Sequence, residues 1–170
     1  MARQRSQIVI CDASPLIGLA IVGGLSWLPK LFGEVCIPVS VRDEVLPGVE
    51  ARGEAEIVAA IASKLLRVWT QPIPRPKPPL ADLDAGETDC ISLALSLAPA
   101  RALLLMDERA GRAMASERGI AVAGTAAIIG LAKKRRLIRA AKPRFATLHA
   151  TDFRMSANVI ETILRDVGEL

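Results

Sequence analysis

Short apolar runs alternate along the chain with longer segments whose apolar residues recur at helical spacing. Strands are expected at Ile8–Cys11, Val35–Ile37, Leu65–Trp69, Ala102–Met106 and Ile120–Ala123. Helices are expected from Pro15 onward, around Val41–Leu46, across Ala55–Lys64, and at Ala85–Leu97, Ala110–Arg118, Ala126–Arg135 and Asn158–Val167. This alternation is typical of βαβ units and predicts an α/β fold with a parallel sheet and right-handed crossovers. The pattern does not determine the order of the strands.

A proline-rich segment separates the two halves of this pattern, with prolines at 72, 74, 76, 78 and 79. Neither half has enough strands to form a sheet of its own. We therefore interpret the segment as a stiff surface loop within one domain over residues 1–170. From Arg139 onward the character of the chain changes to a basic stretch, and the expected helix Asn158–Val167 then completes a helical C-terminal tail.

Two strands end directly in a carboxylate, which favours a site at the sheet edge. Asp12 follows Ile8–Cys11, and Asp107 follows Ala102–Met106. Open α/β folds place their sites at the carboxyl ends of the strands. Ser14, followed by Pro15, is the expected N-cap of the first helix, which leaves Asp12 free to act as a ligand.

Three further carboxylates lie on expected helices. Glu44 follows the second strand and shares a helix face with Ser40, and a solvated surface role competes with a site role. Asp84 and Glu87 have the spacing of a capping box, which is a sufficient structural explanation for Glu87. Asp89 points to a different face of an otherwise apolar helix, so we favour Asp89 over Glu87 as a ligand.

Carboxylates held close together raise one another's pKa unless a cation neutralises them. Oxygen-only ligands suit Mg²⁺ or Mn²⁺, and the single histidine, His149, lies in the tail. The composition therefore argues against a histidine-based zinc hydrolase and favours metal-assisted phosphoryl chemistry. An aspartate-nucleophile phosphatase is a rival, but it needs a second Asp two residues after the first, where Ser14 stands.

Charge and composition narrow the possible partners. The net charge is +4 and the isoelectric point about 9.3, which permits an anionic partner such as nucleic acid. Aromatic residues make up only 3% of the chain, so a nucleic acid would be held mainly through its phosphates. The strongest basic cluster comprises Lys133, Lys134, Arg135, Arg136, Arg139, Lys142 and Arg144. It is either a solvated helix end or a phosphate contact. Arg112 could meet either a carboxylate, as an exposed ion pair, or a phosphate, and the ion pair is the favoured interpretation.

The three cysteines and the apolar stretches indicate the expected compartment. The cysteines are an odd number within apolar segments and form no C-x-x-C motif, which favours free thiols in a reducing compartment. The long apolar stretch Ala121–Ala132 is shorter than the roughly 20 residues of a membrane helix. We expect a soluble, cytoplasmic protein with no membrane partner.

The order and spacing of these motifs resemble those of the PIN-domain superfamily, in particular small prokaryotic PIN-like proteins related to toxin–antitoxin ribonucleases. The segments that carry the resemblance are Asp12 to Ile17, Ile37-Pro38 with Glu44, Gly86-Glu87 with Asp89, Leu105 to Glu108 with Gly111-Arg112, and Gly124-Thr125. One departure is Met106, because better-known members often have Thr or Ser just before the fourth acidic residue.

The resemblance implies a three-layer α/β/α sandwich, a cleft of acidic residues, Mg²⁺ or Mn²⁺, and endoribonuclease activity. Asp12, Asp89 and Asp107 would hold the metal ion, Glu44 would complete the catalytic set, and Glu87 stays an alternative to Asp89. It also implies a homodimer and a cognate antitoxin protein that blocks the cleft. The competing hypothesis is a degenerate PIN-like module that binds RNA or a protein without cutting.

Overall fold

The computed structural model describes residues 7–170, so the first six residues of the expected domain lie outside the description. Within it, parallel strands form one five-stranded sheet in the order β3-β2-β1-β4-β5. The strands are β1 (Ile8–Cys11), β2 (Val35–Pro38), β3 (Leu66–Trp69), β4 (Ala102–Leu105) and β5 (Ala121–Ala123). All four pairings are parallel, as the alternation of strands and helices predicts.

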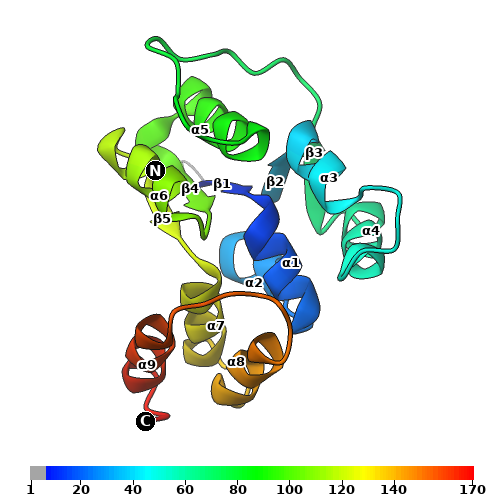
Figure 1. Cartoon of the computed structure of the whole chain (residues 1–170), viewed down its shortest axis with the longest axis vertical. Coiled ribbons are helices and arrows are strands. Elements are labelled where there is room, and N and C mark those ends of the chain that lie inside the picture. The colour runs from blue at the N-terminus through cyan, green and yellow to red at the C-terminus, as the bar shows by residue number, and fades with distance from the viewer. Residues whose placement is uncertain (1–6) are drawn as a thin grey trace, which may run out of the picture.

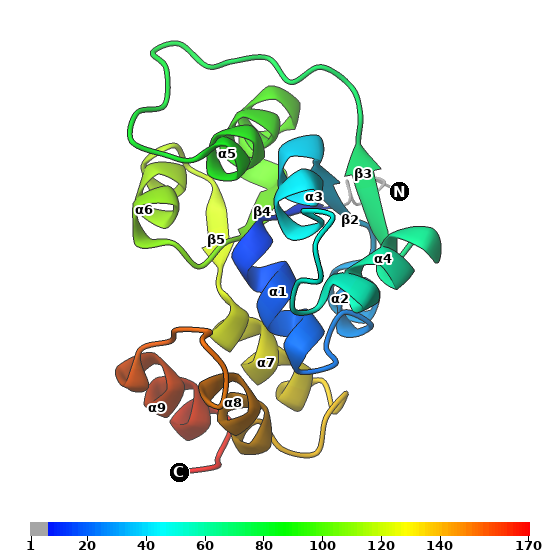
Figure 2. The same cartoon turned by 45° about the vertical axis from the view of Figure 1, so that its right-hand side comes forward.

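Helices cover both faces of the sheet, which makes the molecule a three-layer α/β/α sandwich. Figures 1 and 2 show α5 and α6 on one side of the strands, and α1, α2 and α4 on the other. Beyond α1, the helices α7, α8 and α9 form a group at the end of the molecule that carries the C-terminus (Figure 2). The helices are α1 (Ala13–Ile21), α2 (Trp27–Phe32), α3 (Val39–Val45), α4 (Glu54–Ala62), α5 (Ala85–Leu97), α6 (Arg109–Glu117), α7 (Thr125–Lys134), α8 (Lys142–His149) and α9 (Ala157–Asp166), with a short 3₁₀ turn at Pro99–Arg101.

The central strands form the core because both of their faces are covered. Every residue of β2 is buried, and in β1 only Ile8 is partly exposed. Strands covered on both faces read as continuous apolar runs rather than as alternating ones, which explains why these strands are visible in the sequence. Within residues 7–170, no helix is long and apolar enough to cross a membrane.

The start of α1 differs from the prediction. The helix begins at Ala13 with Asp12 at the N-cap position, so the assignment of Ser14 as N-cap was wrong. The side chain of Asp12 makes no capping hydrogen bond to its own helix. Asp12 has an extended backbone because its N–H continues the β1–β4 ladder and donates to the Leu105 carbonyl over 2.9 Å. Strand pairing therefore extends to Asp12, and the helix starts at the next residue.

The strand order creates a topological switch point between β1 and β4. The chain moves from β1 to β2 and β3 in one direction, and from β4 to β5 in the other. At such a point the connecting helices leave toward opposite faces, and a crevice opens at the carboxyl ends of the two strands. Asp12 follows β1 and Asp107 lies two residues after β4, so both strand-end carboxylates lie at this edge.

The proline-rich segment is a loop without helix or strand, as expected (Figure 2).

Some side chains of the basic cluster near the end of α7 already have partners within the chain. Lys134 pairs with Asp166 at 2.5 Å, and Lys133 lies 3.5 Å from Glu169. Arg144 donates to the Val22 carbonyl over 3.1 Å. These contacts hold the C-terminal helices to the rest of the chain and favour a structural role for this part of the cluster.

Candidate active site

Asp12 is the most deeply buried carboxylate at the switch point, with only 4% of the residue exposed. Its Oδ1 is buried and has no hydrogen-bond partner. Burial raises the pKa of Asp12 to about 7. The backbone N–H of Ala13 lowers this pKa, whereas the charges of Asp84, Glu44 and Glu87 raise it further. A buried acceptor without a partner is costly in a folded protein, so this oxygen calls for a ligand.

Glu44 reaches the same place from α3. A Cβ built on Gly86 would lie 3.1 Å from Asp12 Oδ1 and also 3.1 Å from Glu44 Oε2. The two carboxylates therefore converge on the first turn of α5, where glycine leaves space for both. Desolvation, together with the charges of Asp84 and Glu87, raises the pKa of Glu44. The face of α3 predicted from the spacing of Ser40 and Glu44 is the face turned toward α5.

Asp84 and Glu87 form the predicted capping box at the start of α5. The Glu87 N–H donates to Asp84 Oδ1 over 2.8 Å, and the Asp84 N–H donates to Glu87 Oε2 over 3.0 Å. Glu87 is nevertheless only 6% exposed. A Cβ on Gly111 would lie 2.8 Å from Glu87 Oε1, so the carboxylate is packed between α5 and α6. Burial raises the pKa of Glu87. The hydrogen bond from the Asp84 backbone lowers this pKa, and the charges of Asp84 and Glu108 raise it.

Asp89, the ligand favoured from the sequence, has both carboxylate oxygens engaged within the chain. Ser40 Oγ donates to Oδ2 over 2.6 Å, and Arg75 Nη1 pairs with Oδ1 at 2.5 Å. Arg75 belongs to the proline-rich loop, so this ion pair fastens the loop to α5. Asp89 is absent from the charges that raise the pKa of Asp12, whereas Glu87 is among them.

Asp107 is fixed by the start of α7. The Thr125 N–H donates to Oδ1 over 2.7 Å, and the Thr125 hydroxyl donates to Oδ2 over 2.7 Å. Gly124 permits this approach, because a Cβ there would lie 2.9 Å from both Asp107 Oδ1 and Arg112 Nη1. Arg112 donates to the Met106 carbonyl over 2.9 Å, and it forms no ion pair with any residue of the described chain. The position before Asp107, held by Met106, is fully buried.

The acidic residues thus differ in what surrounds them. Asp12 and Glu44 converge on Gly86, with Asp84 and Glu87 close enough to raise the pKa of both. Asp89 and Asp107 are each held by their own partners. Among residues 7–170, no set of three or more His, Cys, Asp or Glu side chains is arranged so that it could hold a metal ion. The three cysteines are buried and free, and burial raises the pKa of each thiol.

The chemistry of the acidic edge fits a hard divalent cation. Its donors are carboxylate oxygens, the ligands that Mg²⁺ and Mn²⁺ prefer. The buried Oδ1 of Asp12 lacks a partner, and a second carboxylate oxygen approaches the same glycine. A cation there would supply the missing partner and offset the repulsion between the carboxylates.

A parallel sheet between two helical layers, with carboxylates gathered where the strand order reverses, defines an α/β/α sandwich with an acidic edge. The chain belongs to the PIN-domain family, because a family model described as a PIN domain matches residues 8–169. PIN-domain proteins are generally nucleases, which are hydrolases, and they typically use divalent metal ions. No match to the chain was found among curated proteins or among solved structures.

Gly86→Ala tests the convergence of Asp12 and Glu44. In a helix this change normally stabilises by up to about 1 kcal/mol. Here the new methyl would press on both carboxylate oxygens, so we expect a folded protein whose Mn²⁺ affinity falls about tenfold. Calorimetric titration with Mn²⁺ measures the affinity and thermal melting measures stability. Ala85→Gly, at an exposed position of the same turn, is the control; equal Mn²⁺ affinity in both variants would contradict the convergence.

Proposed function

We propose that the protein is a Mg²⁺- or Mn²⁺-dependent endoribonuclease that hydrolyses RNA phosphodiester bonds. The observation that carries the proposal is the buried, unpartnered Oδ1 of Asp12, which lies at the switch point beside Glu44. Membership of a generally nucleolytic family supports hydrolysis. The basic net charge is compatible with a polyanionic substrate.

In this proposal Asp12 holds the cation, with Glu44 and Asp107 beside it. Thr125 positions Asp107 by binding both of its oxygens, so this carboxylate needs no reorganisation when substrate arrives. A bound cation would lower the pKa of a water molecule and neutralise charge on the phosphodiester. Asp89 stays a predicted ligand, and Glu87 competes with it for the third position.

A second candidate function is a PIN-like module that binds RNA or protein without cutting. Two observations favour it: the described residues contain no assembled metal-binding group, and each carboxylate oxygen of Asp89 and Asp107 already has a partner within the chain. The lack of an assembled metal-binding group is also compatible with a catalytic protein, because carboxylates repel one another when no cation lies between them.

The proposed function is tested by titrating the protein with Mn²⁺ in a calorimeter and by incubating it with a panel of RNAs, with and without the metal. We expect saturable Mn²⁺ binding and cleavage that EDTA stops. RNA binding without cleavage, combined with no heat at millimolar Mn²⁺, would establish the binding module instead. The biological setting we propose is that of a cytoplasmic toxin, acting as a homodimer and held inactive by a cognate antitoxin protein.

The raised pKa of Asp12 predicts how stability depends on pH in metal-free protein. The pKa is about 7 in the folded chain, against an ordinary value of 3.8, so the folded state binds this proton more tightly. Raising the pH from about 4 to 7 should therefore lower the free energy of unfolding, by a few kcal/mol at most. Urea melts at pH 5 and pH 8 measure the loss.

The Asp12→Asn variant provides the comparison for this pH dependence, because it keeps the shape of the side chain and cannot titrate. It should lose less stability than the parent between pH 5 and pH 8. Saturating Mn²⁺ should restore stability to the parent at pH 8 but not to the variant. Identical pH profiles in the two proteins would show that Asp12 is ionised normally.

A further inference from the structure

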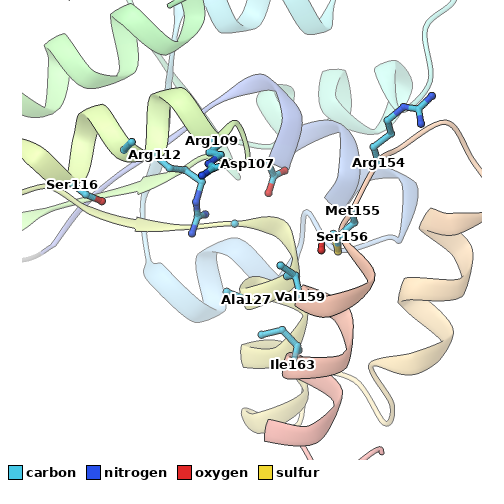
Figure 3. Close-up of a pocket in the computed structure, with 13 residues that line it drawn as sticks. Asp107, Arg109, Arg112, Ser116, Ala127, Arg154, Met155, Ser156, Val159 and Ile163 are labelled. Atoms are coloured by element: carbon cyan, nitrogen blue, oxygen red, sulfur yellow. The ribbon is translucent and has the colours of Figure 1, made fainter.

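A cavity of about 720 Å³ is lined by Asp107, and neither Asp12 nor Glu44 is among its lining residues. Its walls come from α6, from the start of α7 and from the segment that leads into α9 (Figure 3). A cavity of this size is large enough for a compound the size of a nucleotide. The C-terminal tail therefore contributes one wall of a space that adjoins the proposed catalytic edge.

Three arginines line this cavity and none of them forms an ion pair with a residue in the described part of the chain. They are Arg109 and Arg112 on α6 and Arg154 just before α9. Figure 3 shows Arg109 and Arg112 on one side and Arg154 on the opposite side, with the Arg154 side chain directed away from the apolar floor. The lining carboxylate, Asp107, is already bonded through both oxygens to Thr125. These hydrogen bonds come from neutral groups and leave Asp107 charged, so three arginines face one carboxylate and the lining carries a net positive charge.

The floor of the cavity is apolar. Ala127 on α7 faces Val159 and Ile163 on α9, and Met155 borders the same space (Figure 3). Val159 is 45% exposed, which makes it one of the exposed large apolar side chains of the described chain. An apolar floor below a cationic rim matches a ligand that has a flat, weakly polar group attached to phosphates.

We propose that this cavity binds one unpaired nucleotide of the RNA substrate, adjacent to the phosphate that is cut. Arg109, Arg112 and Arg154 contact the flanking phosphates, while the base lies on the floor against Val159 and Ile163. The inference rests on the proposed action on RNA. Only an unpaired base can leave its stack and enter, so the cavity selects single-stranded segments.

Nucleic acid is favoured over an acidic peptide because of where the cavity opens. It shares Asp107 with the acidic edge, so a strand held at the arginines continues directly to that edge. Arginine is also suited to bidentate contact with phosphate. The apolar floor lacks aromatic side chains among its lining residues, which predicts weak discrimination between the bases.

The test measures binding of a short, labelled single-stranded RNA in the presence of EDTA. Fluorescence anisotropy gives the affinity at several salt concentrations. Arg109→Ala and Arg154→Ala should each weaken binding about tenfold and reduce the salt slope by about one. Arg165→Ala is the matched control, because it removes the same charge from an exposed position in the last turn of α9, outside the residues that line the cavity. It should change binding by less than about twofold.

A second pair of variants tests the floor. Ala127→Leu fills the cavity from an exposed position, and Ala146→Leu adds the same group to an exposed position of α8. Only Ala127→Leu should weaken binding of the RNA, and it should leave binding of an abasic strand of equal length unchanged. Circular dichroism verifies that each variant is folded.

The outcomes separate this inference from the proposed function. Binding that is equal in the parent, Arg109→Ala and Arg154→Ala would overturn the cavity assignment, whether or not the parent cuts RNA. A parent that binds through these arginines but never cuts would overturn the proposed function and leave the cavity as an RNA site. Binding of a labelled acidic peptide that is weakened by Arg109→Ala and Arg154→Ala, with no RNA binding by the parent, would assign the cavity to a protein partner.

Discussion

Replacing Asp12 by Asn should reduce metal-dependent RNA cleavage by about 10³-fold while leaving the protein folded. The stabilisation that a divalent cation provides is worth several kcal/mol, and about 1.4 kcal/mol corresponds to a factor of ten in rate. Asn retains the size of the side chain but not the charge that attracts a cation. Initial rates on a single RNA at saturating Mn²⁺ measure the loss, and Mn²⁺ titration should show weakened binding.

Stability should not account for the loss of activity in this variant. The carboxylate of Asp12 is buried without a partner for Oδ1, so an uncharged side chain should raise stability at neutral pH. Asp43→Asn is the matched control, since it removes an exposed carboxylate that neighbours Glu44 on α3. Cleavage by Asp12→Asn at the rate of the Asp43→Asn control would show that Asp12 has no catalytic role.

The strands could be located from the sequence because they are continuous apolar runs, yet their order could not. Pairing joins residues far apart in the chain: Ile8 aligns with Ala102, and Cys11 aligns with Leu105. The residues of either strand do not indicate which other strand it pairs with. The strand order matters most for function, because it alone makes β1 and β4 adjacent and brings Asp12 and Asp107 to one switch point.

Two helices, α2 and α8, were not predicted from the sequence, because their own residues are weak indicators of a helix. α2 is only six residues long and contains Pro29, and α8 begins with a proline in its first turn. Both are stabilised by contacts from outside the helix, such as the Arg144 guanidinium 5.9 Å from the ring of Trp27. Short helices depend mainly on tertiary packing, and single-sequence patterns do not report packing.

The choice between Glu87 and Asp89 depended on tertiary structure for the same reason. The capping box explained Glu87 correctly, but a capping residue can also be buried by a neighbouring helix. Gly111 on α6 allows Glu87 to pack between the helices. An unpaired Asp89 would be an expensive carboxylate in an apolar helix, yet Arg75 from the loop that leads into α5 neutralises it. The fold of that loop and the packing of α6 bring Arg75 and Gly111 to α5, and neither contact follows from the helical pattern of α5 itself.

Glu87→Gln should therefore lower Mn²⁺ affinity and the proposed RNA cleavage more than Asp89→Asn. The Gln side chain can still accept the hydrogen bond from the Asp84 N–H, so the variant isolates the charge that acts on Asp12. We expect Glu87→Gln to lower Mn²⁺ affinity and cleavage by about 10–100-fold, the usual cost of removing a group that supports a metal site. Asp89→Asn should retain both within about threefold, since Ser40 can still donate to its carbonyl oxygen. Calorimetry and initial rates on the two variants, measured together, decide the third ligand. Loss of Mn²⁺ binding only in Asp89→Asn would instead support the ligand set expected from the sequence, with Arg75 displaced by the metal.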